Sequence, residues 1–319
     1  MRTGWRIARG TRRGGRVVNA TLFLVDVFTR RALLGNPVAV VLPDAMPDAA
    51  RMQALAAWNG MPETVFAMPA PDGEAARGGA DYHVRIWSPR RELPFAGHPS
   101  IGTARALLAA GLVTPHVGRL VQQSPHGQVT MRVDDGDDGD DGDDGRIWFE
   151  TPEPRIEPLD AQGAREVLGA LGSSGRHADM ACVAAGARWL VVWFESAERL
   201  DALAPELDAI EQLSRRHEVS GITAVAPGRH GAADFELRSF GPAIGVDEDA
   251  ACGGGNACAA AMLAAKGRWP ARGDSMVATA SQGRHLGRDA SLFWRRAEDG
   301  PRFEIGGHAV LVSRGALSL

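Results

Sequence analysis

The chain of 319 residues is too long for one ordinary hydrophobic core and suits two domains of ordinary size. Hydrophobic residues make up 45% and charged residues 23%, which excludes a disordered chain, and the net charge of -4 gives no reason to expect nucleic acid as a partner. No apolar run approaches the roughly 20 residues that span a bilayer, so we expect no membrane partner.

The first segment, 1–18, is rich in arginine and contains no acidic residue. It lacks the apolar stretch of a secretory signal, so we interpret it as a disordered basic tail. The three cysteines, Cys182, Cys252 and Cys258, form neither a disulfide framework nor a zinc pattern, and the histidines form no metal-binding pair. We therefore predict a cytoplasmic protein that holds no metal.

The elements that follow the tail begin with two strands rich in β-branched residues, LFLVDVF (22–28) and VAVVLP (38–43). A helix then ends near Gly60, and a further strand, VRIWSP, leads to a glycine-rich turn. A helix of alanine, glycine and other small residues runs from Gly97 to Gly111. Because few of its residues are charged, nearly every face of this helix can be buried.

An acidic segment, DDGDDGDDGDD, follows this first set of elements and begins at Asp134. A calcium loop of the EF-hand type needs ligands at positions one, three and five with glycine at six. A glycine in every third place would occupy one of those ligand positions. We therefore interpret 134–145 as a solvated loop between two strands.

The second half repeats the order of the first. The strand WLVVWF, a helix ending near Val219 and the strand LRSFGP precede a second helix of small residues, from Gly253 to Gly267. Aligning Gly97 with Gly253 also aligns Gly111 with Gly267, since both intervals are 14 residues. The sequence thus predicts an α+β protein of two pseudo-symmetric domains.

Each domain is expected to be a strongly bent, mostly antiparallel sheet wrapped around its central helix. We predict the first domain at 19–133 and the second at 146–307. The last strand, 308–319, is expected to return to the first domain.

Both central helices begin at glycine, at Gly97 in one half and at Gly253 and Gly254 in the other. The N-terminus of a helix leaves backbone N–H groups unpaired, and glycine lets an anion approach them. Two such turns at equivalent places would face each other across a cleft. This arrangement predicts a site for a small anionic substrate.

Several motifs, in this order, resemble the phenazine-biosynthesis PhzF-like isomerases. They are GNPVAVV (35–41), NGMPETVF (59–66), RIWSPRRELPFAGHP (85–99), EDAACGG (248–254), QGRHLGR (282–288) and IGGHAVLVSRGAL (305–317). The resemblance implies the diaminopimelate-epimerase fold, isomerisation by proton transfer without a cofactor, and a homodimer. It also implies that Glu63 is the general acid/base, that His98 and Asp249 bind the substrate, and that Gly97 and Gly253 donate backbone hydrogen bonds.

Glu63 also suits this role on physical grounds, because partial burial at the start of an apolar strand would raise the pKa of its carboxyl group towards neutrality.

The second glycine motif departs from the family pattern, which has proline, threonine and serine where this chain has Ala250, Cys252 and Gly254. The segment instead resembles the second cysteine motif of diaminopimelate epimerases, although Ala96 stands where their first cysteine would be. A thiol at a helix N-terminus is expected to have a lowered pKa, so Cys252 is a candidate second acid/base. An epimerase or racemase using Glu63 and Cys252, and a non-catalytic binding protein, stay open as alternatives.

Overall fold

The computed structural model describes residues 18–71, 73–74, 78–134, 145–173, 179–229, 233–270, 277–297 and 300–319. Nearly all of the predicted basic tail and of the predicted acidic loop lies outside these residues.

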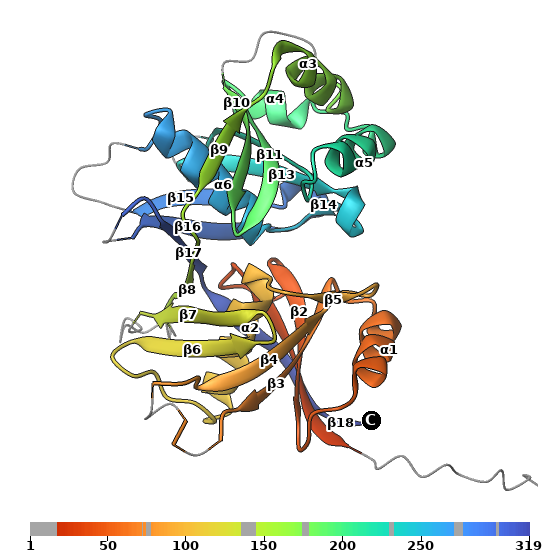
Figure 1. Ribbon diagram of the computed structural model, residues 1–319, viewed down its shortest axis with the longest axis vertical. Helices are drawn as coiled ribbons and strands as arrows, with labels where there is room; N and C mark the ends of the chain where they lie inside the picture. Colours follow the sequence, from red (N-terminus) through yellow and green to blue (C-terminus); the bar gives the residue numbers. More distant parts are fainter. Residues whose placement is uncertain are drawn as a thin grey trace, which may run out of the picture.

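The chain forms two lobes, one above the other in Figure 1. The first lobe contains the early strands and helices together with the last strand: β1 (Asn19–Val27), β2 (Asn36–Pro43), α1 (Ala49–Asn59), β3 (Glu63–Pro69), β4 (Tyr82–Trp87), β5 (Glu92–Leu93), α2 (Gly97–Ala109), β6 (Arg119–Ser124), β7 (Gly127–Val133), β8 (Ile147–Glu150) and β18 (Ala309–Ser318).

The second lobe contains the remaining strands and helices: β9 (Arg155–Pro158), α3 (Ala161–Ala170), β10 (Met180–Ala185), β11 (Ala187–Trp193), α4 (Ala197–Asp201), α5 (Leu207–Arg216), β12 (Ile222–Pro227), β13 (Phe235–Gly241), β14 (Val246–Asp249), α6 (Gly253–Ala265), β15 (Val277–Gln282), β16 (Ala290–Arg296) and β17 (Phe303–Gly307).

The two lobes share one pairing scheme. In the first lobe β2 pairs parallel with β3, β3 antiparallel with β4, β4 parallel with β6 and β6 antiparallel with β7. The second lobe repeats these four pairings with β11, β12, β13, β15 and β16. The predicted α+β fold with two pseudo-symmetric halves and mixed, mostly antiparallel sheets is confirmed.

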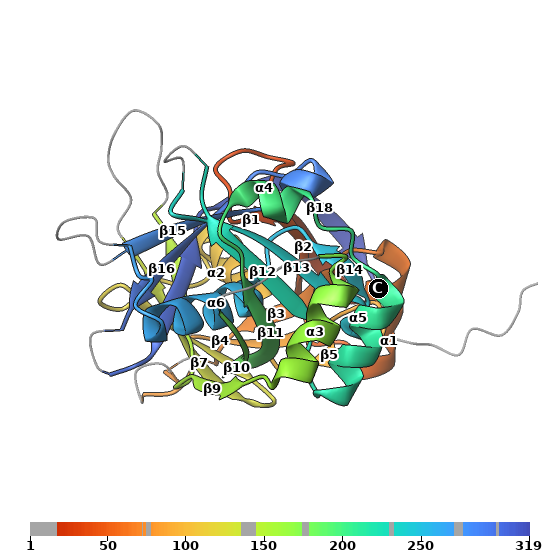
Figure 2. The same ribbon diagram turned by 90° about the horizontal axis from the view of Figure 1, so that it is seen from above.

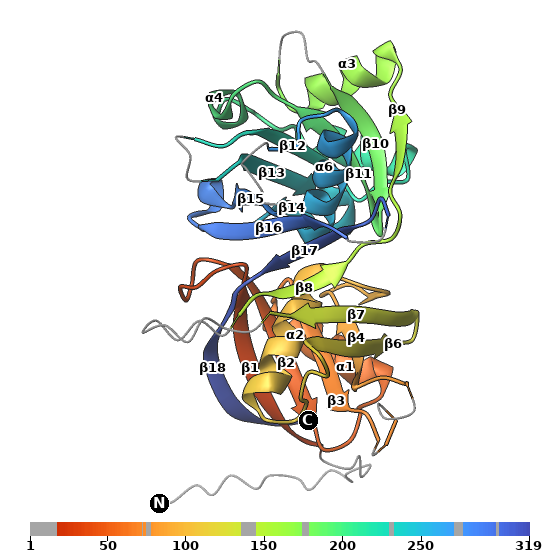
Figure 3. The same cartoon turned by 90° about the vertical axis from the view of Figure 1, so that its left-hand side faces the viewer.

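Two segments carry the chain from one lobe to the other. β8 is followed by β9, which pairs with β10 of the second lobe. β17 is followed by β18, which returns to pair with β1 along its whole length (Figure 3). β8 and β17 also pair with each other, so the sheets of the two lobes are joined at the junction.

The two helices of small residues form the centres of the lobes. Most residues of α2 and α6 are buried, and each helix packs against strands of its own lobe. By contrast, α3 and α5 pack against each other on the outside of the second lobe (Figure 2). Both central helices begin at their predicted glycines, and both have 13 residues, so each ends two residues before the glycine at which it was predicted to end.

The N-termini of α2 and α6 meet at the junction. A Cβ atom built on Gly97 would lie 2.5 Å from the ring of Phe149 in β8, and one built on Gly253 would lie 3.2 Å from the same ring and 3.7 Å from Gly97 Cα. The aromatic ring is thus packed directly against both helix starts. This contact requires glycine at the first of these positions, because any side chain there would overlap the ring.

Candidate functional site

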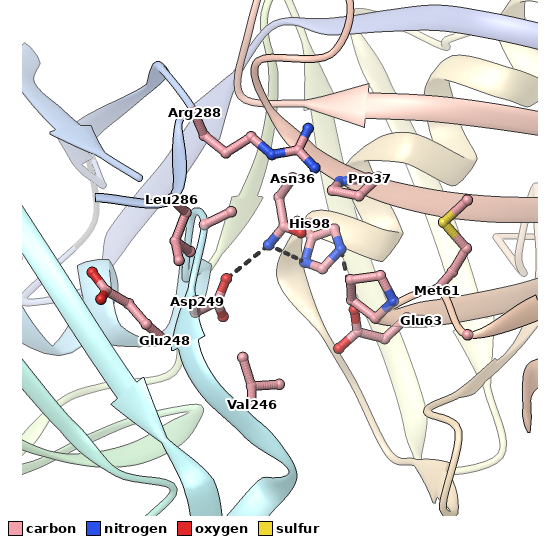
Figure 4. Close-up of a pocket in the computed structure, with 13 residues that line it drawn as sticks. Asn36, Pro37, Met61, Glu63, His98, Val246, Glu248, Asp249, Leu286 and Arg288 are labelled. Carbon is pink, nitrogen blue, oxygen red and sulfur yellow. Dashed lines mark hydrogen bonds and ion pairs between the residues drawn. The ribbon is translucent and has the colours of Figure 1, made fainter. Parts of the chain in front are cut away.

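A cavity of about 390 Å³ opens between the lobes beside the helix starts (Figure 4). It is lined from both halves of the chain: Asn36, Pro37, Gly60, Met61, Pro62, Glu63 and His98 from the first lobe, and Val246, Glu248, Asp249, Ala250, Leu286 and Arg288 from the second. Its volume suits a small organic molecule. The structure therefore brings three of the predicted site residues, Glu63, His98 and Asp249, to one cavity.

Glu63 is the first residue of β3 and follows the turn after α1. The αL conformation of Gly60 ends that helix and directs the chain into the strand. The Glu63 side chain is only 15% exposed. Burial, together with the nearby Asp249 carboxylate, raises the pKa of Glu63 to about 8, as the sequence predicted in direction.

His98 is the second residue of α2, and its imidazole Nε2 lies 3.2 Å from Glu63 Oε2. Burial lowers the pKa of His98 to about 3, although a hydrogen bond with the Pro37 carbonyl opposes this effect. At neutral pH the imidazole is therefore uncharged and the Glu63 carboxyl is largely protonated. The contact therefore joins a neutral acid and a neutral imidazole, although its two atoms lie within ion-pair distance.

Both atoms of this contact are buried. Neither Glu63 Oε2 nor His98 Nε2 has a hydrogen-bond partner of good geometry among the described residues. The two atoms contact each other at 3.2 Å, so the acid and the imidazole form one buried pair in the wall of the cavity that both residues line.

Asp249 ends β14 and lies across the cavity from Glu63 (Figure 4). Its Oδ1 accepts hydrogen bonds from Asn36 Nδ2 at 2.8 Å and from the backbone N–H of Ala251 at 3.0 Å. Burial nevertheless raises the pKa of Asp249. The Asn36 amide also donates to the Ala251 carbonyl at 3.0 Å, so it ties the first lobe to the segment that leads into α6.

Asn36 was missed as a site residue. Asn36 is buried, and its Nδ2, which bonds Asp249, also lies 3.4 Å from His98 Nδ1. It is the second residue of the motif GNPVAVV, and a polar amide at the start of an otherwise apolar strand was the available signal. A second missed lining residue, Arg288, ends the motif QGRHLGR.

The glycines at the helix starts do not line the cavity. Gly97 and Gly253 face Phe149, and the side of Gly254 that would carry a Cβ faces Ala187 and Trp189. Their backbone N–H groups make no hydrogen bond to another described residue. The helix starts are nevertheless next to the cavity in the chain, since Gly97 directly precedes the lining residue His98 and Gly253 follows the lining residue Ala250 by three positions.

Cys252 differs from what the sequence predicts. It is the N-cap of α6, and its Sγ accepts a hydrogen bond from the Gly255 N–H at 3.2 Å. Burial and the neighbouring Asp249 carboxylate raise the pKa of its thiol well above the ordinary value. The predicted lowering of this pKa is wrong, because desolvation outweighs the helix N-terminus. Cys252 does not line the cavity.

The other cysteines are also buried, and all three thiols are free. No three His, Cys, Asp or Glu side chains within the described residues are grouped so that they could hold a metal ion. In the same part of the chain, no helix has the length and apolar character needed to cross a membrane.

The chain is similar to known proteins over most of its length. Residues 25–315 match the model of the phenazine biosynthesis-like protein family. The trans-2,3-dihydro-3-hydroxyanthranilate isomerase of Pseudomonas fluorescens is 32% identical over 300 residues, which is 93% of this chain and 98% of that protein. Antisense-enhancing sequence 1 of Schizosaccharomyces pombe is 32% identical over 271 residues, 83% of this chain and 86% of that one.

Among solved structures, a predicted epimerase from Pseudomonas aeruginosa superimposes with a TM-score of 0.75 at 26% identity, over 93% of this chain and 99% of that chain. A match over most of the chain, identity above 30% with named isomerases and a shared epimerase-like fold agree. The chain therefore belongs to the phenazine-biosynthesis PhzF-like family and is an isomerase with the diaminopimelate-epimerase-like fold.

Proposed function

We propose that this isomerase moves a proton between two positions of a small carboxylated substrate, without a cofactor, in the cavity between the lobes. One observation carries the proposal. Glu63 and His98 line this cavity in contact with each other, and the pKa of Glu63, at about 8, lies close to neutrality. A general acid/base is most efficient when its pKa is near the operating pH.

In the proposed reaction the ionised Glu63 removes a proton from a substrate carbon, and the electron pair of that C–H bond shifts towards a conjugated carbonyl or carboxyl oxygen. Glu63 then returns the proton to a different carbon on the same face, and the double bond moves. No atom is gained or lost. A single base that keeps the proton on one face favours positional isomerisation over inversion.

The remaining site residues are proposed to hold the substrate. His98 and Asp249 would bond its polar groups, while Asn36 positions the Asp249 carboxylate. The free N–H groups at the starts of α2 and α6, at Gly97, Gly253 and Gly254, would stabilise negative charge on the substrate oxygen. A cyclic substrate fits the name of the Pseudomonas fluorescens relative, which is a dihydro-hydroxyanthranilate isomerase.

Epimerisation with Cys252 as the second acid is the weaker candidate. The thiol is buried and does not line the cavity, and its raised pKa makes it a poor base for inversion in the opposite direction.

We further propose that the enzyme functions as a homodimer in the cytoplasm, with domains at 19–133 and 146–307 and with 308–319 returning to the first. The second range differs from the lobes at one strand, because β8 (147–150) pairs with β7 and lies in the first lobe. Three free cysteines suit a reducing compartment, and the pairing of β18 with β1 supports the return of the last segment. Light scattering after gel filtration tests the dimer.

The proposed reaction is tested by solvent exchange. Small carboxylic acids are incubated with the enzyme in D₂O, and mass spectrometry detects deuterium at carbon. We expect exchange in at least one acid, and a loss on the order of 10²- to 10⁴-fold in Glu63→Gln, since an amide cannot accept the proton. Glu153→Gln, at an exposed position, is the matched control. Full exchange in a folded Glu63→Gln variant would refute the role of Glu63.

A further inference from the structure

The cavity contains one group that the proposed mechanism does not use. Arg288 follows the short 3-10 turn Arg284–Leu286, in a loop between β15 and β16 of the second lobe. Its side chain reaches across the junction, and its guanidinium lies above Asn36 and Pro37 at the upper wall of the cavity (Figure 4).

The guanidinium is held in place by the backbone of the first lobe and not by a carboxylate. Arg288 Nη1 donates to the Leu33 carbonyl at 2.7 Å. Within the described residues, no carboxylate lies at ion-pair distance from Arg288. The adjacent Asp289 forms its ion pair with Arg31 instead, so the nearest acidic neighbour in the sequence is already occupied.

Arg288 differs in charge from the other ionisable side chains that line the cavity. Glu248 is fully engaged by Arg238, which donates to both of its carboxylate oxygens, at 2.9 and 2.8 Å. Glu63 and Asp249 are acids, and His98 is uncharged at neutral pH. Among the described lining residues, Arg288 is therefore the only cation. Without it the cavity would repel a carboxylate.

We infer that Arg288 binds the carboxylate of the substrate and so determines that this isomerase accepts carboxylic acids. The inference rests on the proposed function and adds a specificity-determining residue to it. A guanidinium has five N–H donors in a planar fork, and the bond to Leu33 uses one of them. The remaining donors could form a charge-assisted, two-point contact with a carboxylate.

The loop that carries Arg288 also contacts the first lobe. Carboxylate binding by Arg288 would therefore depend on contact between the two lobes. Asp289 donates its backbone N–H to the Leu34 carbonyl at 2.8 Å, next to the contact that Arg288 makes. The loop therefore lies against the 33–34 backbone of the first lobe. A carboxylate bound by Arg288 would be placed by both lobes.

Binding is measured by isothermal titration with benzoate, anthranilate and L-proline, each beside its primary amide. We expect at least one acid to bind the wild-type protein more tightly than its amide. Arg288→Gln should raise the Kd of that acid roughly 10- to 100-fold, the loss typical of a hydrogen bond to a charged group, and change the Kd of the amide less than about threefold. Arg288→Lys should recover part of the loss, since it restores the charge without the fork.

Two control variants separate charge from structure. Arg284→Gln removes an arginine of the same loop that pairs with Glu236 outside the cavity, and it should bind the acid like wild type. Arg31→Gln weakens the docking of the loop by removing the partner of Asp289, and its effect should be much smaller than that of Arg288→Gln. An equal loss in Arg31→Gln would assign the effect to loop position and overturn the inference.

Other outcomes distinguish this inference from the proposed function. Failure of all three acids to bind the wild-type protein, or equal binding by Arg288→Gln, would overturn the role of Arg288. Binding that requires Arg288, in a protein that exchanges no substrate proton with solvent, would support this inference and refute the proposed reaction. Exchange that continues unchanged in Arg288→Gln, with the same KM, would support the proposed reaction and overturn this inference.

Discussion

The two lobes have the same strand pairing but different chemistry at equivalent positions. The parallel ladder of the first lobe begins with Val38 opposite Glu63, and that of the second begins with Leu190 opposite Ile222. The place of the acidic residue is therefore taken by a fully buried isoleucine in the second lobe. Likewise, the alignment of Gly97 with Gly253 places Gly254 where the first lobe has His98.

The helix starts differ as well. The first turn of α2 has no side-chain cap, because its N-cap residue is Ala96, whereas the Cys252 thiol caps the first turn of α6. The duplicated fold thus supplies two similar frames, and at these equivalent positions only the first lobe places a buried acid in contact with an imidazole. Burial of an ionisable carboxyl group reduces stability where the group must be charged, so we interpret Glu63 as a point at which the first lobe gives up stability for function.

The largest expected effect is that of Glu63 on the free energy of unfolding, and it depends on pH. Its carboxyl pKa is about 8 in the folded protein and near 4.5 in the unfolded chain. Between these values the native state holds a proton that the unfolded state has lost, so the free energy of unfolding falls as pH rises from about 4.5 to 8. Glu63→Gln should therefore stabilise the protein at pH 9, by up to about 5 kcal/mol.

Urea unfolding at pH 5 and pH 9 measures this gain. At pH 5 the glutamine variant should resemble wild type much more closely, because Glu63 is then protonated in the folded state. The exposed Glu153→Gln variant should show no such pH dependence. An equal gain at both values of pH would contradict a raised pKa at Glu63.

The second prediction concerns the rate of solvent exchange. If Glu63 acts as the base, only its ionised form removes the substrate proton. The exchange rate should then rise about tenfold per pH unit below the pKa, or about 50-fold between pH 6 and pH 8, before it levels off. A rate at saturating substrate that stays flat over this range would exclude Glu63, with its pKa of about 8, as the base.

The third prediction compares the two helix starts. A methyl group at Gly97 would overlap the Phe149 ring at 2.5 Å, whereas one at Gly253 would be in tight contact at 3.2 Å. Gly97→Ala should cost about 1–3 kcal/mol of unfolding free energy, as over-packing typically does, and Gly253→Ala clearly less. Phe149→Leu, made in the Gly97→Ala background, should restore part of the loss. Equal costs at the two glycines would show that Phe149 does not distinguish them.

The smallest effect is expected at Cys252. Cys252→Thr should change the exchange rate less than about threefold, because threonine keeps a side-chain atom that can accept the Gly255 N–H. Cys252→Ala removes the cap and should lower stability by about 0.5–2 kcal/mol, with little effect on exchange. Loss of activity in a folded Cys252→Thr variant would instead favour the epimerase mechanism.

Much of the fold could be predicted from the sequence because its signals are local. Small residues at successive positions marked α2 and α6, and the equal spacing of their glycines revealed the duplication. The raised pKa of Glu63 was also predictable, because a carboxyl group at the start of an apolar strand is buried in most packings of that strand.

The tertiary structure alone decided the site around that carboxyl group. Asn36 and Asp249 are 213 residues apart in the chain, and their contact exists only because the lobes meet. Arg288 lines the cavity because its loop docks on the backbone of the other lobe. The Cys252 thiol has a raised pKa, against expectation, because the packing of both lobes removes it from water. Desolvation and contact across the junction depend on how the two halves come together, and no local pattern of residues records that.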